Sequence, residues 1–448
     1  MKKLLLFLFA LPLGLSGYSQ SLYWDTKATT FSAASTGISE MTYAHNNANV
    51  IWGYGQDGSG AGADIRVFTK SSDGGLTWSS GAIDVGNTTL IMGGITALTG
   101  TSAVVAVCPA VGSTAQGGIF KTTNSGSTWV KQTSAAFNSA DSFSNIVYFW
   151  DDQTGFCQGD PAGGYFEIYT TTNGGDAWNR LPSANIAPML EGEYAYTRCL
   201  TVTGNTVWFG TNKGRMYKST DRGLNWTAFQ TPLTDFNGGT NFAFADDNNG
   251  IMITSDYTYY TTSNGGVTWT STFPEGMYRN YNLVHVPGTT GTYVSTGEDF
   301  EEVRGSSYTT DGGLTWFNIN DEDVDDPINC SRGLDFADST HGVAGGFNAS
   351  TTVAGVYRWK GSFLANVDFQ STKSFTASPN PTTGLLELSG KNISNVIVYD
   401  ILGKQVSATN YSALNNVSLN LSALNNGVYM VKVTNNTGNT STIKVVKQ

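Results

Sequence analysis

The chain has 448 residues, a formal net charge of −11 and only 13% charged residues. Because its 24 Lys and Arg residues form no cluster, the charge argues against nucleic acid and anionic membrane surfaces as partners. Four cysteines are too few for a disulfide framework, whereas 53 glycines and 12% aromatic residues are typical of an all-β protein with many turns.

The N-terminus has the order of a secretory signal peptide. Lys2 and Lys3 precede an apolar run over residues 4–15, and the small residues Gly17 and Ser19 follow it. The run is shorter than the ~20 apolar residues that a membrane-spanning helix needs. We therefore expect a signal peptide over residues 1–19, cleaved after Ser19, and no membrane span in the mature chain.

An eight-residue phrase then recurs six times. Its first copy is Ser71-x-Asp73-x-Gly75-x-Thr77-Trp78, and the Asp or Asn positions of successive copies lie 51, 49, 48, 43 and 47 residues apart. A period of this length indicates a propeller or solenoid. The Asp or Asn positions are Asp73, Asn124, Asn173, Asp221, Asn264 and Asp311, and the tryptophans are Trp78, Trp129, Trp178, Trp226, Trp269 and Trp316.

Each copy predicts a strand, a tight turn and a second strand. The Asp or Asn side chain can accept backbone N–H groups of the turn, the Gly tolerates a positive φ, and the Trp offers apolar area to a neighbouring sheet. We expect these residues to be structural, not catalytic or metal-binding. The phrase resembles the Asp-box, or BNR repeat, of sialidases and related propellers, which implies that these turns lie on the face opposite the binding site.

A second phrase also recurs, and the number of its copies predicts the number of blades. It consists of an apolar run, a polar turn and another apolar run. Its copies begin near Met41, Ile95, Ile146, Cys199, Phe242, Leu283 and Leu334. The seventh unit lacks an Asp-box, and residues 22–25 look like its missing strand. We predict a seven-bladed β-propeller over residues 20–361, closed by its N-terminal strand. The two phrases together resemble the propellers of photosystem II assembly factors and of xyloglucan-cleaving hydrolases.

The composition changes after residue 361. Residues 362–374 are predicted to form a linker, and alternating apolar runs divided by Asn/Gly turns predict a small C-terminal β-sandwich over residues 375–448. The fold class is therefore all-β. The landmarks Ser378–Gly384, Val396–Lys404 and Leu424–Val433 together resemble the type A C-terminal sorting domain of the bacterial type IX secretion system. That resemblance implies the type IX secretion machinery as a partner and export to the cell surface or the extracellular space. The alternative is a carbohydrate-binding or adhesion sandwich.

A ring of polar residues is predicted at the channel mouth where the first strands of the blades begin. Aligning the second phrase on its turns places Glu40, Asn145, Arg198, Tyr281 and Arg332 at one ring position, with Gly94 and Thr240 between them. Arg279 precedes Tyr281 by two residues, so period-2 alternation points it to the same side. Arginine is well suited to bidentate capture of carboxylate or sulfate.

Acidic loops leave three hypotheses open. Paired carboxylates could act on a glycosidic bond, with Glu40, Asp160, Glu193 and Glu298 as candidates. Asp321, Asp323 and Asp325 could bind Ca²⁺ through oxygen ligands. The third hypothesis is a solvated surface loop.

Catalytic motifs are missing from the sequence. It contains no nucleophile elbow, no His-Glu-x-x-His and no phosphate-binding Gly loop. The leading hypothesis is a non-catalytic module that binds a polysaccharide or a surface protein, without a cofactor. The alternative is a glycoside hydrolase acting on complex polysaccharide. Cys108, Cys157, Cys199 and Cys330 are expected to be buried structural residues, with any pairing left open.

Overall fold

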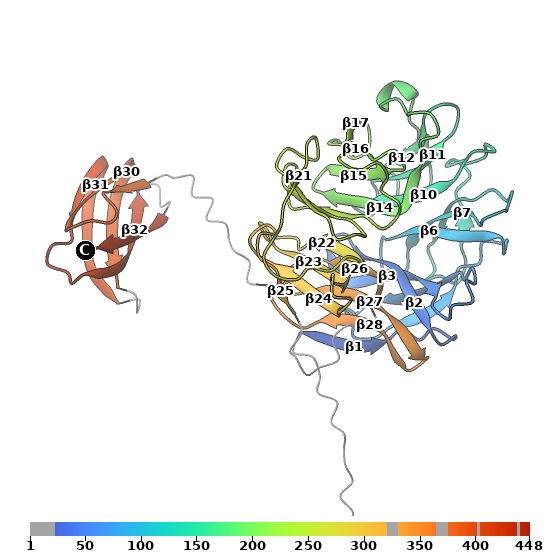
Figure 1. Cartoon of the computed structure of the whole chain (residues 1–448), viewed down its shortest axis with the longest axis horizontal. Coiled ribbons are helices and arrows are strands. Elements are labelled where there is room, and N and C mark those ends of the chain that lie inside the picture. The colour runs from blue at the N-terminus through green and yellow to red at the C-terminus, as the bar shows by residue number, and fades with distance from the viewer. Residues whose placement is uncertain (1–22, 320–329, 364–374, 401–403, 437–439) are drawn as a thin grey trace, which may run out of the picture. The chain divides into compact units, whose positions relative to one another are not determined.

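The computed structural model describes residues 23–319, 330–363, 375–400, 404–436 and 440–448. It divides into two compact units, Met1–Ala365 and Asn366–Gln448. Both consist of β-strands (Figure 1), and one helical turn, η1 (Ser183–Asn185), is found among the described residues. The predicted signal peptide, the Ca²⁺ candidates Asp321, Asp323 and Asp325, and most of the predicted linker lie outside these ranges.

Five sheets of the first unit contain four antiparallel strands each, in chain order. One consists of β6 (Leu90–Ala97), β7 (Ala103–Pro109), β8 (Gly118–Thr122) and β9 (Val130–Lys131). The next consists of β10 (Ser144–Phe149), β11 (Gly155–Pro161), β12 (Phe166–Thr171) and β13 (Asn179–Arg180). The third consists of β14 (Ala195–Thr203), β15 (Thr206–Thr211), β16 (Arg215–Ser219) and β17 (Thr227–Gln230). The last two are β18 (Asn241–Phe244), β19 (Gly250–Ile253), β20 (Tyr259–Thr262) and β21 (Thr270–Ser271), then β22 (Asn282–His285), β23 (Tyr293–Glu298), β24 (Arg304–Thr309) and β25 (Phe317–Asn318).

An eight-stranded sheet joins the two ends of this unit. Its first half is β2 (Thr36–Ala44), β3 (Asn47–Asp57), β4 (Val67–Ser71) and β5 (Ser79–Ala82). Its second half is β26 (Cys330–Phe336), β27 (Gly342–Ser350), β28 (Val353–Trp359) and β1 (Trp24–Ala28). A single residue pair between β2 and β27, Gly37 with Phe347, connects the two halves.

The first strands of these sets form a closed circle. β2 contacts β6, and the contacts continue through β10, β14, β18 and β22 to β26, which contacts β2 again. Figure 1 shows the sheets arranged around a common centre. The arrangement is that of a propeller-like fold, with the first strands around the axis.

The N-terminal strand completes the last set, as the sequence predicts. β1 pairs antiparallel with β28 from Trp24 opposite Trp359 to Ala28 opposite Gly355. The Trp24 side chain is 2% exposed, its ring lies 5.1 Å from that of Trp359, and its Nε1 donates to Ser306 Oγ of β24 at 3.0 Å. The first and last strands of this unit therefore lie in one sheet, and Trp24 fastens that sheet to the preceding one.

The six Asp-box turns use their polar side chains internally. In the first, Ser71 Oγ accepts the Gly75 N–H at 2.9 Å, and Asp73 Oδ1 accepts the Ser71 hydroxyl at 2.8 Å and the Thr77 N–H at 2.9 Å. The same bonds recur in the other five turns. The recurring Gly of each turn has a positive φ, which is 82° at Gly75. These aspartates and asparagines therefore stabilise the turns in which they lie.

The second unit is a five-stranded sheet. It contains β29 (Phe375–Ser378), β30 (Leu385–Tyr399), β31 (Gln405–Asn420), β32 (Gly427–Asn435) and β33 (Thr440–Lys447). β31 pairs along β30, while the other edge of β30 pairs with β29 in its first half and with β32 in its second half. Alternate residues of these strands, among them Leu386, Leu388, Val396 and Val398, are fully buried in a separate apolar core. This unit therefore has a core of its own.

We expect Trp24→Ala to lower the free energy of unfolding of the first unit by about 3–5 kcal/mol, because it removes a buried aromatic side chain from the closing strand. All eleven tryptophans precede residue 360, so tryptophan fluorescence during denaturant unfolding of the full chain reports on this unit. Phe273→Ala is the control, since Phe273 is 96% exposed and its loss should change stability by less than about 0.5 kcal/mol. Equal effects of the two substitutions would contradict closure through Trp24.

Candidate functional site

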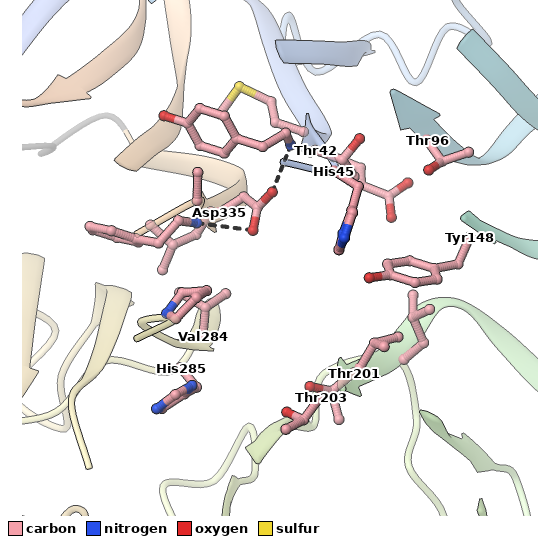
Figure 2. A pocket seen from close by; sticks show the side chains of 18 of the residues that line it. Thr42, His45, Thr96, Tyr148, Thr201, Thr203, Val284, His285 and Asp335 are labelled. Carbon is pink, nitrogen blue, oxygen red and sulfur yellow. Dashed lines mark hydrogen bonds between the residues drawn. The ribbon is translucent and has the colours of Figure 1, made fainter. Parts of the chain in front are cut away.

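The first strands enclose a cavity of about 890 Å³ on the axis of the first unit. Residues of all seven first strands line it, among them Thr42, Thr96, Thr201 and Asp335 (Figure 2). Rim residues such as His45 and Gly204 are exposed, so the cavity opens to solvent at the turns that follow the first strands. Its size lies within the range of roughly 300–1,000 Å³ that small-molecule sites occupy. We call it the axial cavity.

The axial cavity opens at the same end as the Asp-box turns. The turn that follows a first strand is bonded to the Asp-box of its own sheet, as in Gly74 N–H to Asn49 O at 3.0 Å and Gly265 N–H to Asn248 O at 2.8 Å. From the sequence, the ligand is expected at the opposite end, where the first strands begin. In the structure the large hollow lies on the Asp-box side.

Two arginines cross the channel at the end where the first strands begin. Arg198 of β14 donates through Nη1 to Ser39 Oγ and, at 3.4 Å, to Ser39 O on β2, which is not a neighbouring strand. Arg332 of β26 donates through Nη1 to Gly238 O at 3.1 Å, in the loop before β18. These side chains narrow the channel at this level.

Arg198 adopts a strained backbone conformation. Its φ is +60°, and it lies where the pairing of β14 with β15 shifts register between Ala195 and Leu200. A non-glycine residue at positive φ costs of order 1–3 kcal/mol and persists only where the surrounding structure enforces it. The bulge aims this side chain across the channel.

Two carboxyl groups in the cavity wall connect neighbouring first strands. Glu40 Oε2 accepts the Ile95 N–H of β6 at 2.9 Å, and Asp335 Oδ2 accepts the Tyr43 N–H of β2 at 2.8 Å. Burial raises the pKa of each carboxyl to about 7. Glu40 is among the residues predicted from the sequence, whereas Asp335 is not. A carboxylate inside the apolar run Leu334–Phe336 was the available signal.

Asp160 and Glu193 are held by other parts of the protein and do not line the axial cavity. Asp160 Oδ1 accepts the Asn145 Nδ2–H at 2.7 Å and the Ala195 N–H at 3.0 Å, and burial raises its pKa to about 6. Glu193 is 2% exposed, and its carboxylate accepts bonds from Arg215 Nη1, Thr211 Oγ1 and the Leu190 N–H, each at 2.8 Å. Both carboxylates and Asn145 are therefore engaged in hydrogen bonds within the protein, outside the axial cavity.

The remaining predicted residues also lie outside the axial cavity. Arg304 Nε donates to Glu298 Oε1 at 2.7 Å, and hydrogen bonds from Tyr281 and then from Arg304 lower the pKa of Glu298. Arg279 is 1% exposed and ion-paired with Asp299, and its Nη2 donates to Asn318 of the outermost strand β25 at 3.0 Å. Arg279 therefore points away from the channel. Of the predicted set, Glu40 and Arg198 line the axial cavity.

Neither a metal cluster nor a disulfide is found in the described ranges. No group of three His, Cys, Asp or Glu side chains there could hold a metal ion. Cys108, Cys157 and Cys199 are buried free thiols, as the sequence analysis expects.

Two segments match known protein families. Residues 377–448 match the secretion system C-terminal sorting domain, and residues 110–240 match the photosynthesis system II assembly factor YCF48 family. The first match marks the chain for type IX secretion to the cell surface or the extracellular space, and it implies the secretion machinery as a partner. No helix in the described ranges is long and apolar enough to cross a membrane.

Several solved structures are similar to this chain at low sequence identity. A YCF48 bound to a D1 peptide is 13% identical, covers 76% of this chain and 97% of its own, and has a TM-score of 0.51. PorZ, a surface component of the type IX secretion system of Porphyromonas gingivalis, is 13% identical over 98% of this chain and 61% of its own, with a TM-score of 0.46. An ancestral GH74 enzyme is 14% identical, covers 94% of this chain and 63% of its own, and also has a TM-score of 0.46. Among curated proteins, no relative matches the chain.

The raised pKa of Glu40 predicts a pH dependence of stability. The folded protein holds this proton up to a pH of about 7, whereas the unfolded chain releases it near the ordinary value of 4.5. The free energy of unfolding must therefore fall as pH rises through this window, by at most about 1.4 kcal/mol per unit of pKa difference. Glu40→Gln keeps an acceptor for the Ile95 N–H and should flatten the decline between pH 5 and pH 8. Denaturant unfolding followed by tryptophan fluorescence measures the slope.

Glu298→Gln is the matched control for Glu40→Gln. Hydrogen bonds lower the pKa of Glu298, so this carboxyl titrates below the same window. The control should keep the wild-type slope. A Glu40→Gln variant with an unchanged slope would show that Glu40 does not hold its proton to neutral pH.

Proposed function

We propose that this chain is a surface-exported binding protein whose axial cavity takes a ligand without chemical conversion. Its first unit is a seven-bladed propeller over residues 20–361, and its second is a sorting sandwich over residues 375–448. The ligand is a glycan or a segment of a surface protein. The observation that carries the proposal is a solvent-open cavity of about 890 Å³, lined by polar side chains of all seven first strands.

The state of the carboxylates supports binding over catalysis. Hydrolysis of a glycosidic bond needs two carboxyl groups that face one groove, about 5–9.5 Å apart. Of the four acids that the sequence suggests, Glu193, Asp160 and Glu298 are each engaged by partners outside the axial cavity. The fold comparison is compatible with ligand binding, because the similar YCF48 structure carries a bound peptide.

One observation favours the alternative of a glycoside hydrolase. Glu40 and Asp335 both line the axial cavity, and burial raises the pKa of each to about 7. A carboxyl that keeps its proton near neutral pH is what a general acid requires. Each also accepts a backbone N–H group from the next first strand, which is a sufficient structural reason for its position.

A screen of the full exported chain against polysaccharides and surface proteins separates the two functions. We expect saturable binding in isothermal titration calorimetry, with no new reducing ends after prolonged incubation with any bound polysaccharide. Reducing ends that appear with wild type and disappear with Glu40→Gln or Asp335→Asn would establish the hydrolase instead. Phe273→Ala, on the exposed surface, should behave as wild type in both assays.

A further inference from the structure

The guanidinium of Arg198 has an unpaired N–H donor. Its Nη1 bonds to Ser39, whereas Nε is buried without a hydrogen-bond partner and Nη2 makes no bond to any described residue. The seven ion pairs of the described chain do not include Arg198 or Arg332. Nε is enclosed by protein atoms, whereas Nη2 keeps accessible surface and is the donor left for a ligand. A charged N–H donor of this kind forms a strong hydrogen bond with a carboxylate.

A second positive charge lies near Arg198. Burial and then the neighbouring Arg198 guanidinium lower the pKa of Arg332, although part of the Arg332 side chain is exposed. Two like charges where the channel narrows raise the local potential for an anion. The chain as a whole carries a net charge of −11, so this end of the channel is a local exception.

Three hydroxyl groups line the cavity from adjacent strands on the Arg198 side. They belong to Thr96 of β6, Tyr148 of β10 and Thr201 of β14, and Figure 2 shows their side chains around the hollow. None of the three hydroxyls makes a hydrogen bond to a described residue, in contrast to Thr203, whose hydroxyl donates to Phe244 O at 2.7 Å. Each is a donor and acceptor that a ligand hydroxyl can satisfy.

We propose that the axial cavity binds an acidic oligosaccharide, with one sugar carboxylate held by Nη2 of Arg198 and sugar hydroxyls bonded to Thr96, Tyr148 and Thr201. This inference rests on the proposed binding function and names its ligand class. A carboxylate would accept the N–H donor that Arg198 leaves unpaired. A ligand rich in hydroxyl groups would pair with the three unpaired hydroxyl groups of the cavity. A peptide C-terminus would satisfy the arginine but would leave most of the hydroxyls without a partner.

Tetragalacturonic acid and its neutral methyl ester are matched probes for isothermal titration calorimetry with the full chain. A charge-assisted bond of ~1.5–3 kcal/mol predicts that the acid binds about 10–100-fold more tightly than the ester. Arg198→Asn should abolish this preference, and asparagine tolerates the positive φ of this position. Arg198→Lys keeps the positive charge but loses the guanidinium N–H donors, so it should keep only part of the preference for the acid over the ester. Arg180→Gln, which removes an exposed arginine elsewhere, is the control.

A separate pair of variants tests the proposed contacts of the hydroxyl groups. Tyr148→Phe and Thr201→Val each remove one hydroxyl and should weaken the acid and the ester by the same factor, about 2–10-fold. These variants keep the test valid if Arg198→Asn fails to fold, which tryptophan fluorescence reports.

Five outcomes contradict the inference, and they differ in what they say of the proposed function. Equal affinity for acid and ester, or a preference that survives Arg198→Asn, removes the Arg198 site and leaves binding intact. A peptide with a free C-terminus that binds through Arg198, while both sugars fail, assigns the site to protein partners. Failure of both sugars and of the peptide removes the ligand class, and the wider screen then decides the proposed function. Release of reducing ends from tetragalacturonic acid overturns non-catalytic binding itself.

Discussion

The backbone pairing of β1 with β28 is the interaction on which the first unit depends. Without it, β28 would present an unpaired edge, and Trp359 would lose its contact with Trp24. Elsewhere in the described chain, the two ends of the unit meet through one residue pair between β2 and β27 and through Ser331 and Asp335 of β26, which accept the Ile38 and Tyr43 N–H groups of β2. The axial cavity is the space inside the circle of first strands, so its wall depends on this closure.

Between neighbouring sheets, side chains replace the backbone ladder. Thr42 Oγ1 accepts the Ala97 N–H at 2.9 Å, as Asp335 accepts that of Tyr43 and Glu40 that of Ile95. An edge N–H in this position is buried and needs an acceptor. A carboxyl can serve there as well as a hydroxyl, and burial then favours its neutral form. The raised pKa values of Glu40 and Asp335 therefore follow from their place between sheets, before any chemistry is considered.

Local patterns made the fold predictable, and long side chains made the site unpredictable. The Asp-box turns and the sorting segment each depend on residues close together in the sequence, such as Ser71, Asp73 and Gly75. The closing strand pairs distant residues, and it was predictable because the repeat count left the seventh unit one strand short. The prediction that Arg279 faces the channel was wrong. Arg279 precedes Asn282, the first residue of β22, so the alternation of a strand does not apply to it. Asn145 and Arg198 lie at register shifts, where the alternation of faces is interrupted. That Arg198 reaches Ser39 across the axis depends on distances that no sequence spacing encodes.

The two arginines narrow the channel at the end opposite the exposed rim of the axial cavity. They cross the channel where the first strands begin, and the exposed rim lies at the Asp-box end. A ligand that enters from the rim meets uncharged hydroxyl groups first and the Arg198 guanidinium last. Because a fold hosts many functions, the propeller-like architecture alone does not select a ligand. Selection falls to the narrow end, where a strained backbone positions Arg198 and the described protein leaves its Nη2 without a partner.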